Sequence, residues 1–407
     1  MFGPSSTAKI AWPPPSGACG GMMLVIGKPS LRSCSFVPFS LLISLSCDLM
    51  CVRVNASRTG IATLKSLNDL QVEERMTPDF HTALENALRR AMPKFASINS
   101  MVRLSGGASQ ETWAFDAIIG DETLPLILRR APGGIRIIAE GSTSVPLSTE
   151  ATVIETSRMA GVAAPRVRYV LKDEDSAGHG YVMDRLPGET IARKILRDET
   201  FASVRPKLAY QCGEILARIH NVDIAPIRHL LPVVDGPTQL RAYRDTLDTF
   251  DYPHPVFELA FQWLEPRMEA SARQTLVHGD FRHGNLLISP KGLEAALDWE
   301  LTHIGDPLED IGWVCTNSWR FGIANKVVGG FGDLADLLRG YEDAGGGRID
   351  PEEVRTWIVY GSLKWGIMCM KMYQGFLNDR SVERAAIGRR SSETEIDLIN
   401  LIIGGRL

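Results

Sequence analysis

Four polar residues that could carry chemistry lie between positions 276 and 300, around two short apolar runs. The runs, 285–288 and 293–297, flank a Pro-Lys-Gly turn, and this pattern predicts a β-hairpin. A hairpin brings the residues before its first strand next to those after its second strand. The four residues that it would gather are His278, Asp280, Asn285 and Asp298. Two carboxylates and a neutral oxygen ligand are what metal-assisted transfer of a phosphoryl group to a hydroxyl requires.

The spacing of these residues indicates separate roles. Asn285 follows Asp280 by five residues, which is the interval found in the catalytic loop of protein kinases. We expect Asp280 to accept the proton of an acceptor hydroxyl and to orient that hydroxyl. Asn285 and Asp298 are expected to bind Mg²⁺ ions that bridge the phosphates of ATP, and His278 to brace the loop. Glu300 could reach the metal through water or remain solvated.

The complete pattern resembles a known family. His-Gly-Asp and Asp-Trp-Glu replace the His-Arg-Asp and Asp-Phe-Gly segments of protein kinases, and this form is similar to the aminoglycoside phosphotransferase and choline kinase family. The resemblance covers about 101–407. It implies an α+β, protein-kinase-like fold with two lobes: a small antiparallel β-sheet with a helix, and a larger, mainly α-helical part.

Several segments are most similar to one bacterial branch of that family, which resembles the kinase domains fused to acyl-CoA dehydrogenases in animals. They include Leu-Ser-Gly-Gly-Ala-Ser, Leu-Asp-Trp-Glu-Leu, Gly-Asp-Pro-Leu-Glu-Asp and Ser-Trp-Arg-Phe-Gly. The resemblance implies a hydroxyacyl-CoA as the acceptor. Basic side chains that could meet its phosphates are Arg320, Lys326, Lys364, Lys371, Arg389 and Arg390.

A glycine-containing turn between two predicted strands precedes the hairpin in the sequence. Small residues there let backbone N–H groups approach phosphates, and a serine hydroxyl can add a hydrogen bond. The residues concerned are Gly106, Gly107 and Ser109. An ordinary hairpin turn is the alternative interpretation.

The next strand ends in two arginines, which alternation sends to opposite faces of the sheet. By resemblance to the lysine of protein kinases, we assign Arg129 to the nucleotide phosphates and Arg130 to a solvated strand end. A helix that Ser148 or Thr149 caps would carry Glu150, the expected partner of Arg129. Compensation of the helix dipole is the alternative role for this glutamate.

A further apolar strand ends at Pro-Gly, where kinase-like folds have the hinge between the lobes. The resemblance implies that Met183 lies behind the adenine, and that Asp184 and Leu186 offer backbone groups to it. On the helix after Gly-Asp-Pro, the resemblance assigns Asp310 to hold the backbone of the catalytic loop. We also expect helices over 239–250, 256–273 and 395–403, the last with a capping box at Ser392-x-x-Glu395.

The organisation expected from the whole chain has three parts. Residues 1–75 follow no amphipathic period and are expected to be a disordered or mis-assigned extension, or else a targeting segment. Residues 76–186 would form the nucleotide-binding lobe, and 187–407 the catalytic and substrate-binding lobe.

Composition limits the partners. A net charge of −4 gives no sign of nucleic-acid binding, and the seven cysteines contain no Cys-x-x-Cys pair, as expected in a reducing, cytoplasmic setting. Pro38 and Asp48 interrupt the most apolar run, so stable membrane insertion is not expected. The expected ligands are ATP, Mg²⁺ and a small-molecule hydroxyl substrate. An aminoglycoside or choline-type acceptor, a catalytically silent nucleotide-binding module and a protein kinase remain alternatives.

Overall fold

The computed structural model describes residues 78–104, 110–135, 143–271, 273–405 and 407, which all belong to one unit of the chain, 72–407. The glycine turn predicted to contact phosphates, with Gly106, Gly107 and Ser109, lies outside the described residues. The whole of the predicted 1–75 extension does so as well.

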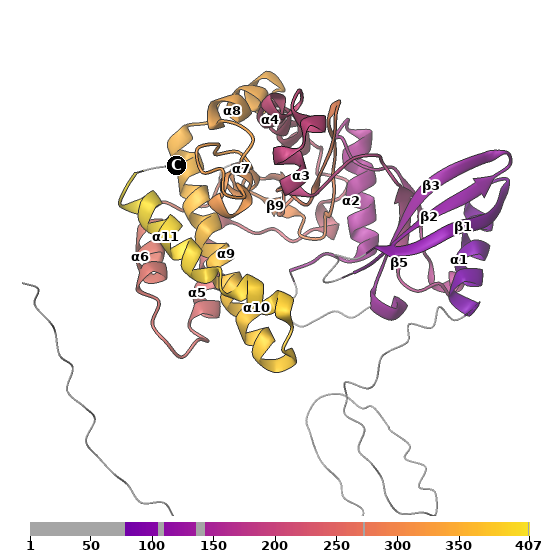
Figure 1. The fold of residues 1–407 in the computed structure, drawn as a ribbon, viewed down its shortest axis with the longest axis horizontal. Coiled ribbons are helices and arrows are strands. Elements are labelled where there is room, and N and C mark those ends of the chain that lie inside the picture. Colours follow the sequence, from indigo (N-terminus) through magenta and orange to yellow (C-terminus); the bar gives the residue numbers. More distant parts are fainter. Residues whose placement is uncertain (1–77, 105–109, 136–142, 272, 406) are drawn as a thin grey trace, which may run out of the picture. The chain divides into compact units, whose positions relative to one another are not determined.

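The described part contains a five-stranded antiparallel sheet with the order β1-β2-β3-β5-β4 (Figure 1). Helix α1 precedes this sheet in the chain, and α2 is inserted between β3 and β4. The bounds are α1 Pro78–Ala91, β1 Phe95–Leu104, β2 Glu111–Ile119, β3 Glu122–Arg130, α2 Leu147–Met159, β4 Val167–Val170 and β5 Gly180–Asp184.

The two helices pack on opposite faces of the sheet because side chains alternate along each strand. Leu126 and Leu128 of β3 lie in a buried cluster with Leu84 and Leu88 of α1. Ile127, between them, belongs instead to the cluster that contains the buried side chains of α2. Position 129 therefore faces α2, and position 130 faces α1.

The remainder of the chain is mainly helical and carries two short strand pairs, β6 with β9 and β7 with β8. The elements are α3 Ala192–Arg197, α4 Leu208–His220, α5 Gly236–Leu247, α6 Pro255–Leu264, β6 Thr275–Val277, β7 Leu286–Ser289, β8 Gly292–Ala296, β9 His303–Gly305, α7 Leu308–Cys315, α8 Leu334–Asp343, α9 Pro351–Asp379, α10 Val382–Gly388 and α11 Ser391–Ile402.

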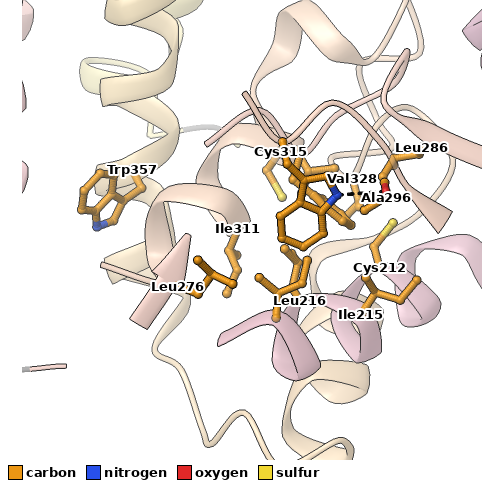
Figure 2. Packing of buried hydrophobic residues seen from close by; sticks show 14 of the residues in the cluster. Cys212, Ile215, Leu216, Leu276, Leu286, Ala296, Ile311, Cys315, Val328 and Trp357 are labelled. Carbon is orange, nitrogen blue, oxygen red and sulfur yellow. Dashed lines mark hydrogen bonds between the residues drawn. The ribbon is translucent and has the colours of Figure 1, made fainter. Parts of the chain in front are cut away.

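The β7–β8 hairpin is fixed by apolar packing on the helices around it. Figure 2 shows Leu286 and Ala296 of the hairpin among the side chains of Cys212 and Leu216 from α4 and Ile311 from α7. Burial of this apolar surface holds the strands in one register, since a slip by one residue would turn these side chains outward.

Three predicted helix boundaries are wrong. Helix α2 begins at Leu147, before both residues expected to cap it, and no side-chain cap is present. Helix α6 ends at Leu264 rather than near position 273. The final helix begins at Ser391, so Ser392 lies inside its first turn, and its hydroxyl donates to the carbonyl of Arg389.

The long helix α9 begins as its capping residues indicate. Asp350 accepts a hydrogen bond from the backbone of Glu352 and exchanges bonds with Glu353 in a capping box. Among the helices of the described residues, none has the length and apolar character needed to cross a membrane.

Candidate active site

The predicted hairpin is present and gathers polar residues at its open end. The amide of Leu297 donates to the carbonyl of Asn285 at 2.8 Å, which closes the ladder beyond the paired strands. The imidazole of His278 lies 3.1 Å from the carbonyl of Leu297 through Nε2. The segment before β7 and the segment after β8 are therefore in direct contact, next to Asp298.

Asp280 has an ordered carboxylate. Its Oδ1 accepts hydrogen bonds from Arg282 Nε at 2.9 Å and from the indole Nε1 of Trp313 at 2.7 Å. Its Oδ2 accepts one from Asn285 Nδ2 at 2.7 Å. Three donors hold the group in one orientation, which is what a residue that must align a hydroxyl requires.

The amide of Asn285 has a defined orientation because both of its neighbours are acceptors. Nδ2 donates to the carboxylate of Asp280 and to its carbonyl oxygen at 2.9 Å. The side-chain oxygen therefore points away from Asp280. It is available to bind a cation.

His278 acts as a neutral brace in this geometry. It is fully buried, and burial lowers its pKa although Asp310 and Asp280 oppose the shift. Its Nδ1 accepts from the amide of Asp280 at 3.3 Å, so Nε2 must carry the proton that is donated to Leu297. A ring that uses both nitrogens in this way supports the loop and has no nitrogen left for proton transfer.

Asp310 holds the backbone of the loop, as the resemblance implied. Its two oxygens accept the amides of His278 at 2.8 Å and Gly279 at 2.9 Å. His220 approaches the same carboxylate at 3.2 Å through Nε2. Burial alone would raise the pKa of Asp310, but the hydrogen bond from His220 and the neighbouring groups lower it, so the carboxylate stays ionised.

Gly279 explains why this loop has His-Gly-Asp in place of His-Arg-Asp. Its φ is +82°, which favours glycine, and a Cβ atom would lie 2.5 Å from the carbonyl oxygen of Leu301. The segment after Asp298 occupies the space that a side chain would need.

Arg129 is the second centre of the site. Its Nη2 lies 2.8 Å from Asp298 Oδ1, 3.4 Å from Glu150 Oε1 and 3.5 Å from Glu300 Oε2. The expected pairing of Arg129 with Glu150 is present. Glu150 also accepts the amide of Trp299 at 3.2 Å, which connects α2 to the end of the hairpin.

Burial and neighbouring charges together set the pKa values of Arg129 and Glu150. Burial alone would lower the pKa of Arg129, but Glu150 and the other carboxylates raise it, so the guanidinium stays charged. Burial raises the pKa of Glu150 to about 7, against the opposing effect of Arg129. The side chain of Glu300 is 19% exposed and lies 3.5 Å from Arg129.

Arg130 is not a solvated strand end, contrary to the prediction. Its side chain is 13% exposed and pairs with Glu111 at 3.1 Å. The guanidinium lies over the ring of Phe80, 3.9 Å from its centroid, and donates to the carbonyl of Ala177. The prediction failed because α1 packs on this face of the sheet. Strand alternation shows which face a side chain points to, but it does not show whether a helix buries that face.

The predicted hinge residues lie at the end of β5 and just after it. Met183 is buried within the sheet, 9% exposed. The amide of Asp184 donates to the carbonyl of Arg166, and its carboxylate pairs with Arg168. In the described part of the chain, the amide of Leu186 has no backbone partner.

The available oxygen atoms fit a Mg²⁺ ion that is bound jointly by the protein and the nucleotide phosphates, and not one enclosed by protein ligands alone. Within the described ranges, no three His, Cys, Asp or Glu side chains gather as a metal site. Asn285 Oδ1 and Asp298 Oδ2 have no hydrogen-bond partner among those same residues, and the side chain of Asp298 is 34% exposed. Mg²⁺ usually takes one or two protein oxygens and completes its shell with phosphates and water, and these two atoms match that pattern.

Asp298 has an unusual backbone. Its φ is +63°, in the left-handed region that side chains other than glycine, asparagine and aspartate seldom adopt. The turn after β8 thereby directs its carboxylate toward Arg129.

Two of the six basic residues proposed for acyl-CoA phosphates cannot serve that purpose. Lys364 is 8% exposed and pairs with Glu309 at 3.3 Å, and Arg320 is 3% exposed and donates to the carbonyls of Cys315 and Ala324. Two others lie in ion pairs, Lys326 with Asp333 and Arg390 with Glu393, while Lys371 and Arg389 are exposed.

The buried partner of Lys364 belongs to a network that the sequence did not reveal. Glu309 also accepts from Gln239 at 2.5 Å and lies 3.0 Å from His303. Burial alone would raise the pKa of Glu309, but His303 and Lys364 lower it to about 2. The carboxylate is therefore ionised inside the core, where it depends on its partners.

We expect Lys364→Met to destabilise the fold by about 3 kcal/mol or more, because it leaves the buried charge of Glu309 short of its cation. Lys371→Met, at an exposed position of the same helix, serves as the control and should change stability by about 0.5 kcal/mol or less. Urea unfolding measures both variants. Equal stability of the two variants would contradict the buried ion pair.

Comparison with known proteins is consistent with this geometry. The family model described as the phosphotransferase enzyme family matches residues 100–356, more than half of the chain. The chain belongs to the phosphotransferase enzyme family, and the predicted enzyme class, a phosphotransferase, is confirmed.

Among curated relatives, the chain is 29% identical over 253 residues to acyl-CoA dehydrogenase family member 10 of Mus musculus. The match covers 60% of this chain and 22% of the relative, so the chain spans about a fifth of that protein's length. This match confirms the predicted resemblance to the family branch associated with acyl-CoA dehydrogenases.

Solved structures share the fold. A candidate aminoglycoside phosphotransferase from Ralstonia eutropha JMP134 superposes with a TM-score of 0.63 at 20% identity, over 79% of this chain and 97% of that chain. Spectinomycin phosphotransferase, in complex with ADP and spectinomycin, gives a TM-score of 0.52 at 13% identity, over 78% and 98%. The predicted kinase-like α+β fold is confirmed.

Proposed function

We propose that this protein is an ATP- and Mg²⁺-dependent kinase that transfers the γ-phosphoryl group to the hydroxyl of a small molecule. The observation that carries the proposal is the ordered carboxylate of Asp280, bonded to Asn285 and joined through the hairpin to Asp298. An acceptor hydroxyl next to Asp280 would lose its proton to that carboxylate as its oxygen attacks the γ-phosphorus. The bond to the β-phosphate oxygen breaks, and ADP leaves.

The nucleotide would lie between the hinge and the hairpin. Met183, Asp184 and Leu186 would meet the adenine, and Arg129, held by Glu150, would face the phosphates. Asn285 and Asp298 would hold Mg²⁺, which supplies positive charge to the phosphates when bound. The glycine turn with Gly106, Gly107 and Ser109 is proposed to cover the phosphates, and the lobes to divide as 76–186 and 187–407.

A hydroxyacyl-CoA is the acceptor that we propose. The support is similarity to a relative named as an acyl-CoA dehydrogenase family member. An aminoglycoside or amino alcohol is the second candidate, because spectinomycin phosphotransferase shares the fold. Reaction in the cytoplasm, where ATP and CoA esters are available, is part of the proposal.

Nucleotide binding is tested first, by thermal unfolding. We expect ATP with Mg²⁺ at a hundredfold excess over Kd to raise the Tm by about 5 °C, because a ligand that binds only the folded state stabilises it. ATP with EDTA should give a smaller shift, since Asn285 and Asp298 would hold the metal and its positive charge would favour the phosphates. No shift under either condition would contradict the nucleotide site.

The acceptor is then identified by ADP release. Hydroxyacyl-CoAs of different chain length, choline and aminoglycosides are assayed side by side, with the corresponding CoA esters that lack the hydroxyl as matched controls. Turnover with a hydroxyacyl-CoA and not with its control supports the proposed acceptor. A nucleotide-induced Tm shift without turnover on any acceptor would favour a catalytically silent nucleotide-binding module.

A further inference from the structure

The carboxylate of Asp280 has an asymmetric set of hydrogen bonds. Oδ1 accepts two donors, Arg282 Nε at 2.9 Å and Trp313 Nε1 at 2.7 Å, whereas Oδ2 accepts one, from Asn285. A carboxylate oxygen has two lone pairs in its plane. Oδ1 is therefore saturated, and Oδ2 retains one position for a further donor.

Trp313 is fixed from several sides. It lies on α7, 4% exposed, with the ammonium of Lys364 4.7 Å from its ring centroid. The ring of Trp319 meets it edge-on, with centroids 5.1 Å apart and an interplanar angle of 66°. Because Lys364 is itself held by Glu309, a buried ion pair sets the position of the indole.

The same tryptophan pair also supports the second donor to Oδ1. The guanidinium of Arg282 lies over Trp319, 4.5 Å from the ring centroid, and its Nη1 donates to the carbonyl of His283 at 2.8 Å. Both donors to Oδ1 are thus anchored in one aromatic and cationic cluster, which we define as Arg282, Trp313, Trp319 and Lys364.

We propose that Trp313 is a positioning residue of the phosphoryl transfer: its indole N–H holds Oδ1 of Asp280, so that Oδ2 is directed at the acceptor hydroxyl. The inference rests on the proposed function and deepens it, because it names the oxygen that receives the proton. A carboxylate free to rotate would present either oxygen at varying angles, and misalignment at a reacting centre lowers the rate steeply.

Trp313→Phe isolates the hydrogen bond from the packing. Phenylalanine keeps an aromatic ring against Lys364 and Trp319 and removes the N–H donor. Trp263→Phe is the matched control, because Trp263 lies half-buried on α6 with its ring against Arg267, outside the cluster.

We expect Trp313→Phe to lower kcat about tenfold to a hundredfold, the effect of losing a hydrogen bond to a charged group. The KM for ATP and the nucleotide-induced Tm shift should stay within twofold of wild type, because the contacts of the indole, with Asp280, Trp319 and Lys364, include none of the residues assigned to the nucleotide. Trp263→Phe should match wild type. Unchanged kcat in Trp313→Phe, or equal losses in kcat and in nucleotide affinity, would overturn the proposal.

A spectroscopic measurement tests the contact without turnover. The chain has eight tryptophans, so the indole ¹H–¹⁵N spectrum is resolvable, and Trp313→Phe assigns the Trp313 signal by its absence. Asp280→Ala should shift that signal more than any other indole signal. An unmoved Trp313 signal would overturn the proposal. Absence of turnover in wild type with every acceptor would instead count against the proposed function, while the indole signal still decides the contact.

Discussion

Replacing Asp280 with asparagine is expected to abolish measurable turnover, with a loss in kcat of about a thousandfold or more. Asparagine keeps the size of the side chain but cannot take a proton from the acceptor hydroxyl. The carboxylate oxygens accept hydrogen bonds from Arg282, Asn285 and Trp313. The amide nitrogen of asparagine would replace one of these acceptors with a donor, so at least one of the three hydrogen bonds would be lost.

The measurement is ADP release with the best acceptor of the panel, together with the Tm shift caused by ATP and Mg²⁺. That shift should persist in Asp280→Asn, because the groups assigned to the nucleotide are intact. Asp173→Asn is the control for loss of one carboxylate at an exposed site, 94% accessible, and should be fully active. Near-normal turnover of Asp280→Asn would remove the proposed proton acceptor.

Asp298→Ala is expected to abolish turnover and also to weaken the response to Mg²⁺. The substitution removes the carboxylate assigned to the metal and the 2.8 Å ion pair with Arg129. It also places alanine at a φ of +63°, a backbone cost of about 1 kcal/mol that aspartate bears more easily. We therefore expect a slightly lower Tm without ligand and a loss of the Mg²⁺-dependent part of the Tm shift.

Asp298→Asn separates these effects. Asparagine tolerates the left-handed backbone and retains one oxygen, so its Tm without ligand should be close to that of wild type. It lacks the charge, so its turnover should be low at millimolar Mg²⁺ and should rise at higher concentrations. Equal activity of Asp298→Ala and wild type would show that the metal is held elsewhere.

Local signals explain which parts of the site could be predicted. The hairpin was visible because two apolar runs flank a Pro-Lys-Gly turn, and its geometry follows from strand pairing alone. Alternation sends the two adjacent arginines to opposite faces of the sheet, and Arg129 was assigned by resemblance to the lysine of protein kinases. Asp310 was assigned by resemblance, and its hydrogen bonds to two consecutive amides confirm it.

Contacts that depend on the packing of distant elements could not be predicted. Trp313 lies 33 residues from Asp280, and nothing in the sequence fixes the rotation of α7 that brings the two together. Lys364 was expected to be available to phosphates, since charged residues are seldom buried unless paired, and its partner Glu309 lies 55 positions away. The predicted end of α6 was wrong although Pro266 follows Leu264 by two residues, and proline, which has no backbone N–H, ends a helix near that point.

The backbone of Asp298 has a consequence for the history of this chain. A left-handed position accepts aspartate, asparagine or glycine at the lowest cost, whatever the chemistry around it. A descendant that had lost catalysis would still gain about 1 kcal/mol of stability by keeping one of these three residues at 298. Asp280 has no such conformational demand, since its φ is not positive. In relatives that have lost activity, we therefore expect substitutions at position 280 to appear before substitutions at position 298.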